Sequence, residues 1–296
     1  MTTAANGAWK RAALGLAARW GGRWMSGNGA PRVAILNYHS IHPEKRFRSA
    51  TPELFERHLD WLRLQVDVIR FEQVLEAASR PRTRPAVAIT FDDGYADNYE
   101  YAYPALVRHS FPATFFLTAG LLDKDSAVVD RFRAMRASDY EAIRPLAWRQ
   151  VREMHRAGMS IGAHTYSHPN LAGLSRGDAY RELVQARRVI EDRLGEAVHA
   201  VAYPCGAPGK HVTPQTMELA AAAGFEYAAM VWFRAVDPSD SPFGIPRFDV
   251  SHDTEGVLWQ KLHGWWDYVG WWQKNRRSWT NPTPPKPYIW ENRKSA

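Results

Sequence analysis

The stretch Ala86-Val87-Ala88-Ile89-Thr90-Phe91-Asp92-Asp93-Gly94 decides the fold. Its first six residues are apolar or β-branched, which predicts a buried strand, and Asp-Asp-Gly is typical of the turn that ends one. Neighbouring strand residues point to opposite faces, so Asp92 and Asp93 should have different partners unless the chain turns there. Two buried carboxylates at a strand end also require a cation or a shared proton to offset their repulsion. A solvent-exposed turn is the alternative interpretation.

Similar apolar runs alternate with helix-like stretches on both sides of this segment. The predicted strands are 33–38, 66–70, 86–91, 113–118, 160–163, 198–203, 227–232 and 245–250. The predicted helices are 52–64, 71–78, 97–108, 148–157, 176–194 and 214–223. This alternation indicates parallel βαβ units whose functional groups gather at the carboxyl ends of the strands. Seven or eight units in about 220 residues favour an α/β barrel.

A pair of histidines follows the predicted strand 160–163. His164 and His168 are four residues apart, so a helical turn there would place both imidazoles on one face. Such a pair alone is more often a surface or core feature. Imidazole together with carboxylate is, however, a common zinc ligand set. Because Asp92-Asp93 and the histidine pair both follow predicted strands, we expect them to meet at the same barrel mouth.

These two motifs make the sequence resemble the polysaccharide deacetylase family, the NodB-homology enzymes of carbohydrate esterase family four. Thr90-Phe91-Asp92-Asp93-Gly94 matches the family's first motif, and His164-Thr165-x-x-His168 matches its second. The agreement covers about residues 32–250 and continues through 111–116, 158–162 and 202–206. The resemblance implies a distorted (β/α)7-type, NodB-like barrel, which we place at residues 32–254.

The resemblance also implies a catalytic site. One divalent metal ion would be held by Asp93, His164 and His168, with Asp92 as the general base for the hydrolytic water. Zinc is the expected ion, and Co²⁺, Ni²⁺ or Fe²⁺ are alternatives. Three protein ligands leave positions open for water and an acetyl carbonyl. The oxyanion would be stabilised by the backbone amide of Cys205, whose own side chain we expect to be buried and unreactive.

The sequence departs from the common family pattern in two places. The third motif usually has an arginine two residues before its proline, and that position is Ala202 here. We expect Arg247, in the last predicted strand, to pair with the base instead, with a surface arginine as the alternative. The usual C-terminal Leu-x-His setting for the acid has no clean match. Residues 36–40, Leu-Asn-Tyr-His-Ser, instead resemble the circularly permuted branch that includes exopolysaccharide deacetylases, so His39 is expected to protonate the leaving amine.

The net charge of +7 belongs to the two ends of the chain. Residues 1–32 and 259–296 each carry +5, whereas residues 33–258 carry −3. Ten of the thirteen tryptophans also lie in these ends. We therefore expect a basic amphipathic extension at residues 1–31 and a Trp-rich basic helix with a Pro-rich tail at residues 255–296. A single cysteine excludes an internal disulfide framework.

The terminal segments show helical apolar spacing at Trp9, Ala13, Leu16 and Trp20 and at Leu258, Leu262, Trp265, Val269 and Trp272. Tryptophan and basic residues beside an apolar face are typical of a helix on an anionic membrane surface. The alternative is that the C-terminal helix packs on the barrel, and both can hold.

A nucleic-acid partner is not expected, because the core is acidic and has no recognition motif. Residues 12–18 are a poor signal-peptide core. We therefore expect a cytoplasmic location with membrane association and favour the periplasm less.

The function that this sequence predicts is metal-dependent hydrolysis of a C–N bond other than a peptide bond. The substrate would be an N-acetylated amino sugar in a polysaccharide or lipid-linked saccharide. A sugar O-deacetylase or deformylase with the same site is one alternative, and an inactive glycan-binding barrel is another. Binding alone needs no metal triad with a base, which argues against the inactive barrel.

Overall fold

The computed structural model describes residues 31–44, 48–136 and 144–275. The predictions made for residues 1–30 and 276–296, including the N-terminal amphipathic helix and the Pro-rich tail, lie outside the described residues.

Seven parallel strands close into a barrel in the order β1-β10-β9-β8-β7-β6-β5, and β5 pairs back onto β1. Their bounds are β1 Val33–Tyr38, β5 Ala86–Phe91, β6 Thr114–Leu117, β7 Ser160–Ala163, β8 Ala200–Ala202, β9 Tyr227–Val231 and β10 Ile245–Asp249. An eighth strand, β4 (Asp67–Val68), pairs with the first residues of β5 outside this ring. Two short strands, β2 (Ser40–Ile41) and β3 (Ser49–Ala50), form a separate pair. The predicted α/β barrel is therefore confirmed.

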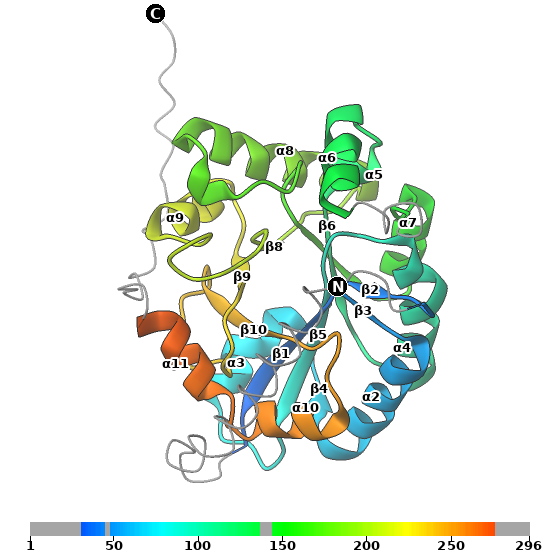
Figure 1. Ribbon diagram of the computed structural model, residues 1–296, viewed down its shortest axis with the longest axis vertical. Coiled ribbons are helices and arrows are strands. Elements are labelled where there is room, and N and C mark those ends of the chain that lie inside the picture. Colours follow the sequence, from blue (N-terminus) through cyan, green and yellow to red (C-terminus); the bar gives the residue numbers. More distant parts are fainter. Residues whose placement is uncertain (1–30, 45–47, 137–143, 276–296) are drawn as a thin grey trace, which may run out of the picture.

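Helices surround the strands (Figure 1). They are α2 Pro52–Gln65, α3 Val74–Ser79, α4 Tyr103–His109, α5 Ala119–Leu122, α6 Ser126–Arg136, α7 Trp148–Arg156, α8 Arg176–Leu194 and α9 Pro214–Ala222. Local signals account for several bounds: the Thr51 side chain caps α2, and Gly195, in the left-handed region at φ 76°, ends α8. Helices α5 and α6 were not predicted.

Strand alternation sorts the side chains into an inner and an outer set. One cluster contains small residues from alternate strand positions, among them Val33, Ile35, Ala86, Ala88, Ala200, Ala202 and Ala229. The intervening positions belong to the larger cluster packed against the helices. On β1, β5 and β10 the inner set continues through Asn37, Thr90 and Arg247 towards the carboxyl ends of the strands. Arg247 is fully buried in this inner set, with its guanidinium carbon 5.3 Å from the centre of the Phe116 ring.

The C-terminal segment forms two helices, α10 (Glu255–Leu262) and α11 (Asp267–Asn275), so the prediction of one continuous helix is wrong. Gly264 lies at φ 80° in the turn between them, which changes the direction of the apolar stripe. Leu258, Leu262, Trp266 and Val269 are buried in the main core. Packing on the barrel thus accounts for these residues.

Three hydrogen bonds also fasten these helices to the barrel. The Trp232 indole donates a hydrogen bond to the Gly270 carbonyl at 2.8 Å. Lys261, counted above with the basic C-terminal end, is buried and donates to the Asp249 carbonyl at 2.6 Å and the Asp253 carboxylate at 2.5 Å. Trp259, Trp271 and Trp272 remain 40%, 50% and 42% exposed.

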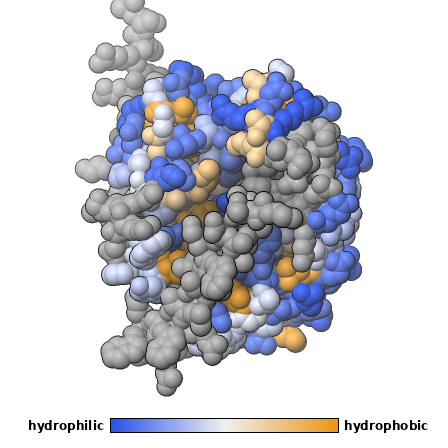
Figure 2. All heavy atoms as spheres, in the orientation of Figure 1, coloured by the Kyte–Doolittle hydropathy of each residue, from blue (hydrophilic) through white to orange (hydrophobic). Residues whose placement is uncertain are grey.

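The described surface on the face shown in Figure 2 is largely hydrophilic, with separate hydrophobic patches. None of the helices within the described residues combines the length and apolarity needed to cross a membrane.

Candidate active site

Asp93, His164 and His168 converge at the carboxyl ends of β5 and β7. Asp93 Oδ1 lies 3.6 Å from His164 Nε2 and 3.4 Å from His168 Nε2, and the three donor atoms lie within 4.8 Å of one another. Tetrahedral ligands at the usual zinc–nitrogen and zinc–oxygen distances are separated by about 3.3–3.5 Å. The two carboxylate–imidazole distances therefore fit a single divalent ion.

Hydrogen bonds orient this donor set. His164 Nδ1 lies 2.7 Å from the Ala202 carbonyl oxygen, which can only accept, so Nδ1 carries the proton and Nε2 has a free lone pair. The Tyr95 hydroxyl donates to Asp93 Oδ2 at 2.7 Å, so the other carboxylate oxygen is the one near the imidazoles. One carboxylate and two imidazoles, held in this way, suit a divalent metal chemically.

The histidine pair does not lie on a helical turn, so that part of the prediction is wrong. Residues 164–168 form an irregular loop in which Thr165 and His168 adopt positive φ values of 64° and 57°. The His168 amide donates to Thr165 Oγ1 at 3.0 Å and closes this loop. The imidazoles meet because the backbone doubles back, with their ring centroids 4.9 Å apart.

Two further site residues are held in γ-turns. The Gly94 amide donates to the Asp92 carbonyl at 3.0 Å across Asp93, whose φ is 73°. The Gly206 amide likewise donates to the Pro204 carbonyl at 2.7 Å across Cys205, whose φ is 61°. Such turns are rare and strained, and strained residues gather at functional sites. Asp92 and Asp93 have different partners although the chain turns at Asp93, which is the case in which strand alternation does not require it.

Asp92 is buried and points to a different set of groups. Arg247 donates from Nη1 to Asp92 Oδ1 and from Nη2 to Asp92 Oδ2, both at 2.8 Å. The Asn37 amide donates to Oδ2 at 3.0 Å, and its carbonyl accepts from Arg247 at 2.9 Å. Burial alone would raise the pKa of Asp92, but attraction to Arg247 and the hydrogen bonds from Arg247 outweigh it and lower the pKa to about 2. Asp92 is therefore ionised at neutral pH.

His39 lies at the end of β1 and is 6% exposed. Its Nε2 is 3.2 Å from Arg48 Nη1, and because a guanidinium can only donate, the ring proton of this state is on Nδ1. That buried nitrogen makes no hydrogen bond with the described residues. Burial lowers the pKa of His39, whereas the nearby Asp93, Asp92 and Asp249 carboxylates raise it and Arg48 lowers it further. His39 thus lies in the field of both motif aspartates.

The prediction that the Cys205 side chain is buried is wrong, because the residue is exposed. Cys205 follows β8 in a turn at the rim of the barrel and does not continue the buried strand. Its backbone amide donates to none of the described residues.

Two residues of the site were missed from the sequence. Asn37 bridges Asp92 and Arg247, and Asp249 lies 3.8 Å from Arg48 and favours the protonated form of His39. The available signal was strand alternation, because Asn37 is two residues before His39 and Asp249 is two residues after Arg247.

The sequence of this chain is similar to that of known proteins. The polysaccharide deacetylase profile matches residues 79–228, half of the chain. The chain is 24% identical to YxkH of Bacillus subtilis (strain 168) over 236 residues, 79% of this chain and 76% of that protein. It is 22% identical over 241 residues to the poly-beta-1,6-N-acetyl-D-glucosamine N-deacetylase of Staphylococcus aureus (strain MRSA252), 78% of this chain and 77% of that protein.

A solved structure shares the fold. The Streptococcus pyogenes deacetylase PplD in complex with acetate superposes with a TM-score of 0.65 at 24% identity, covering 79% of this chain and 99% of that chain. The matched profile, the barrel and the two motifs at its mouth lead to one conclusion: this chain belongs to the polysaccharide deacetylase family.

Proposed function

We propose that this protein is a metal-dependent hydrolase that removes N-acetyl groups from the amino sugars of a glycan. The observation that carries the proposal is the convergence of Asp93, His164 and His168 beside the ionised Asp92. The relative from Staphylococcus aureus is named as an N-deacetylase of an N-acetylglucosamine polymer, and the PplD structure contains acetate, the product of such a reaction. Both support this substrate class.

Asp93, His164 and His168 would hold one divalent ion, which would supply polarisation of the acetyl carbonyl and a lowered pKa of the attacking water. Asp92, held ionised by Arg247, accepts the proton of that water. The Cys205 amide donates to the developing oxyanion. His39, in its imidazolium form, protonates the leaving nitrogen as the C–N bond breaks, so that acetate and a free amine are released.

Zinc is the ion we propose, since two imidazoles and one carboxylate with open positions form a common catalytic zinc site. Co²⁺, Ni²⁺ and Fe²⁺ suit the same ligands. Stripping the protein with a chelator and restoring each ion in turn, followed by activity measurement, distinguishes them.

Acetate release from oligomers of β-1,6-linked N-acetylglucosamine tests the proposed reaction. We expect release to depend on the metal, and Asp92→Asn to lower kcat by about 10²–10⁴-fold while metal binding persists. N-formylated and O-acetylated analogues serve as parallel substrates. Activity only on an O-acetylated sugar would make the enzyme an O-deacetylase, and activity only on the formylated sugar a deformylase. A metal-loaded protein that releases nothing from any of them contradicts the proposal.

We also infer that the protein meets its glycan at an anionic membrane surface on the cytoplasmic side. Support comes from Trp259, Trp271 and Trp272, which are 40–50% exposed on the C-terminal helices, and from the charge of +5 at each end of the chain. Amphipathic aromatic rings favour a membrane–water interface.

A further inference from the structure

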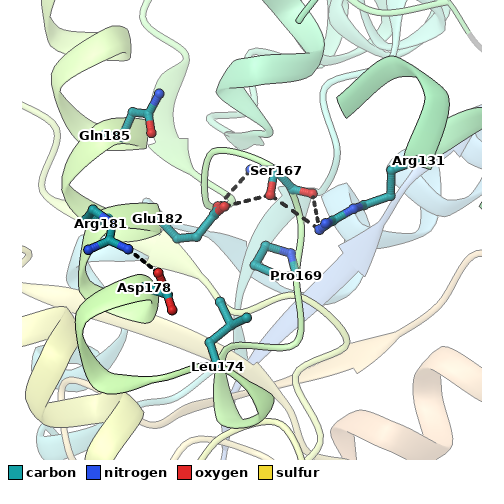
Figure 3. A pocket seen from close by; sticks show the side chains of 8 residues that line it. All are labelled: Arg131, Ser167, Pro169, Leu174, Asp178, Arg181, Glu182 and Gln185. Carbon is teal, nitrogen blue, oxygen red and sulfur yellow. Dashed lines mark hydrogen bonds and ion pairs between the residues drawn. The ribbon is translucent and has the colours of Figure 1, made fainter. Parts of the chain in front are cut away.

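The loop that carries both histidines is supported from outside the barrel by two helices. Glu182 of α8 accepts from the Tyr166 amide at 3.0 Å and from the Ser167 amide at 2.8 Å. Its other oxygen accepts from the Ser167 hydroxyl at 2.6 Å. From the opposite side, Arg131 of α6 donates to the Ser167 carbonyl at 3.2 Å and to its hydroxyl oxygen at 3.3 Å. Figure 3 shows Ser167 held between these two side chains.

Helix α5 also donates hydrogen bonds to the backbone of the loop. The Ala119 and Gly120 amides donate to the Thr165 and Tyr166 carbonyls at 3.3 and 2.9 Å. A Cβ at Gly120 would lie 2.8 Å from the Tyr166 oxygen, so this close approach requires glycine. The backbone of residues 165–167 therefore depends on hydrogen bonds from outside the loop. Glu182 supplies the acceptors for the amides of two of these three residues, Tyr166 and Ser167.

This support matters because the loop is strained. Thr165 and His168 both hold left-handed conformations that L-residues adopt at a cost, and such conformations persist only where the surroundings enforce them. Ser167 directly precedes His168, so any movement of its peptide displaces the second imidazole. Groups that orient metal ligands from behind typically contribute 10–100-fold to metal affinity or activity.

We propose that Glu182, together with Arg131, is a positioning residue that sets the metal affinity of the Asp93–His164–His168 site. It touches neither the metal donor atoms nor the reacting groups, and it acts through Ser167 and the loop backbone. The inference rests on the proposed metal site. We call the contacts of Glu182 and Arg131 with Ser167 the clamp. These three residues also form part of the wall of a surface pocket of about 290 Å³ beside the loop.

Titration of metal-free protein with Zn²⁺, in competition with a chromophoric chelator, tests the proposal. We expect Glu182→Ala to weaken Zn²⁺ binding by about 100-fold, and Glu182→Gln and Arg131→Met by about 10-fold each. The absorption spectrum of the Co²⁺-loaded protein should also change in the Glu182 variants, because it reports ligand geometry.

Matched controls separate positioning from general stability. Glu191→Gln makes the same change on the same helix, where the carboxylate accepts from Arg187 and from the Val198 amide at 3.0 Å. Arg133→Met removes a neighbouring arginine of α6. Both controls should leave Zn²⁺ affinity and the Co²⁺ spectrum unchanged.

The outcomes are distinguishable. A wild-type protein that binds neither Zn²⁺ nor Co²⁺ contradicts the metal site and the proposed function with it. If the wild type binds metal and the Glu182 and Arg131 variants bind it as tightly, with only the Tm of the metal-free protein lowered, the clamp is merely structural and this inference alone fails. Should Glu182→Ala not fold, Glu182→Gln and Arg131→Met decide the question.

Discussion

Arg247 on β10 donates a hydrogen bond to each carboxylate oxygen of Asp92, although the two residues are 155 positions apart in the chain. Both side chains are buried, and the guanidinium also contacts Asn37 and Thr90 at 2.9 and 3.2 Å. Two-point pairing of this kind fixes the orientation of the carboxylate as well as its charge. The pairing therefore fixes the position and orientation of the Asp92 carboxylate, the proposed base, which a single hydrogen bond would leave free to rotate.

Replacing Arg247 by Met should destabilise the protein by about 3–5 kcal/mol at pH 7, because it leaves a buried charge without its partner. The folded pKa of Asp92, about 2, is below its unfolded value, so the pair stabilises the protein above about pH 4 and this contribution is lost as the pH falls towards 2. The difference between variant and wild type should thus shrink below pH 4. Urea unfolding at pH 7 and pH 3 measures it.

Arg234 offers a matched control, since it also forms a two-point pair with a buried carboxylate, that of Asp240. Arg234→Met should destabilise the protein but leave kcat unchanged at temperatures where it is folded. Equal kcat values for Arg247→Met and wild type would contradict a role for Arg247 in placing the base.

Substitution of His39 by Gln should lower kcat by about 10²–10⁴-fold with metal content unchanged. His109→Gln is the control, because His109 pairs with Glu56 at 3.0 Å on the helical layer. If His39 is the acid, its pKa sets the alkaline limb of the pH–rate profile. Asp249→Asn removes a group that raises this pKa and should move the limb to lower pH, whereas Arg48→Met removes a group that lowers it and should move the limb to higher pH. Shifts in the same direction would argue against His39 as the acid.

The buried carboxyl group of Asp97 should make the stability of the protein depend on pH in an unusual way. Burial raises its pKa to about 7, although the Ser40 hydroxyl and the Ile41 amide donate hydrogen bonds to the carboxylate. Because the folded pKa is above the unfolded value, Asp97 keeps its proton in the folded protein at pH values where it has lost it in the unfolded chain. The free energy of unfolding therefore falls as the pH rises from about 4 to about 7, by up to about 1.4 kcal/mol per pH unit.

Asp97→Asn should therefore be more stable than wild type at pH 8, with the gain shrinking towards pH 5. Urea unfolding at both pH values tests this. Asp60→Asn, on the exposed side of α2, makes the same change and should have no comparable effect. A gain that is independent of pH would show that Asp97 is already ionised in the folded protein at pH 5.

The membrane proposal is best tested with point variants. Deleting the C-terminal segment would also remove Leu258, Leu262 and Lys261, which are buried in the barrel's packing. Alanine at Trp259, Trp271 and Trp272 together should instead reduce sedimentation with anionic liposomes several-fold, because fewer rings enter the interface. Leu64→Ala, at a side chain that is 70% exposed on α2, is the control. Unchanged binding of the triple variant would rule out these tryptophans as the contact.

Much of the secondary structure could be predicted from the sequence. The eight strands were placed within a few residues, and α8 was predicted at its observed bounds, Arg176–Leu194, because apolar period, caps and glycine stops are local signals. Helix α5 was missed because it has only four residues, too short for a period to show. Helix α6, of eleven residues, was also missed. The break at Gly264 was missed because the apolar spacing of residues 258–272 continues across it.

The sequence by itself determined the alternation of strands and helices and the motif residues Asp92, Asp93, His164 and His168, because motif and period are properties of contiguous residues. The sequence also led us to expect that Arg247 pairs with Asp92, and the structure confirms this over a surface position. Only the tertiary structure decided that Asn37 bridges them and that Glu182 supports the histidine loop. The physical reason is barrel closure. Pairing β1 with both β5 and β10 brings side chains from three distant strands into one buried layer, where each must find a partner from another part of the chain.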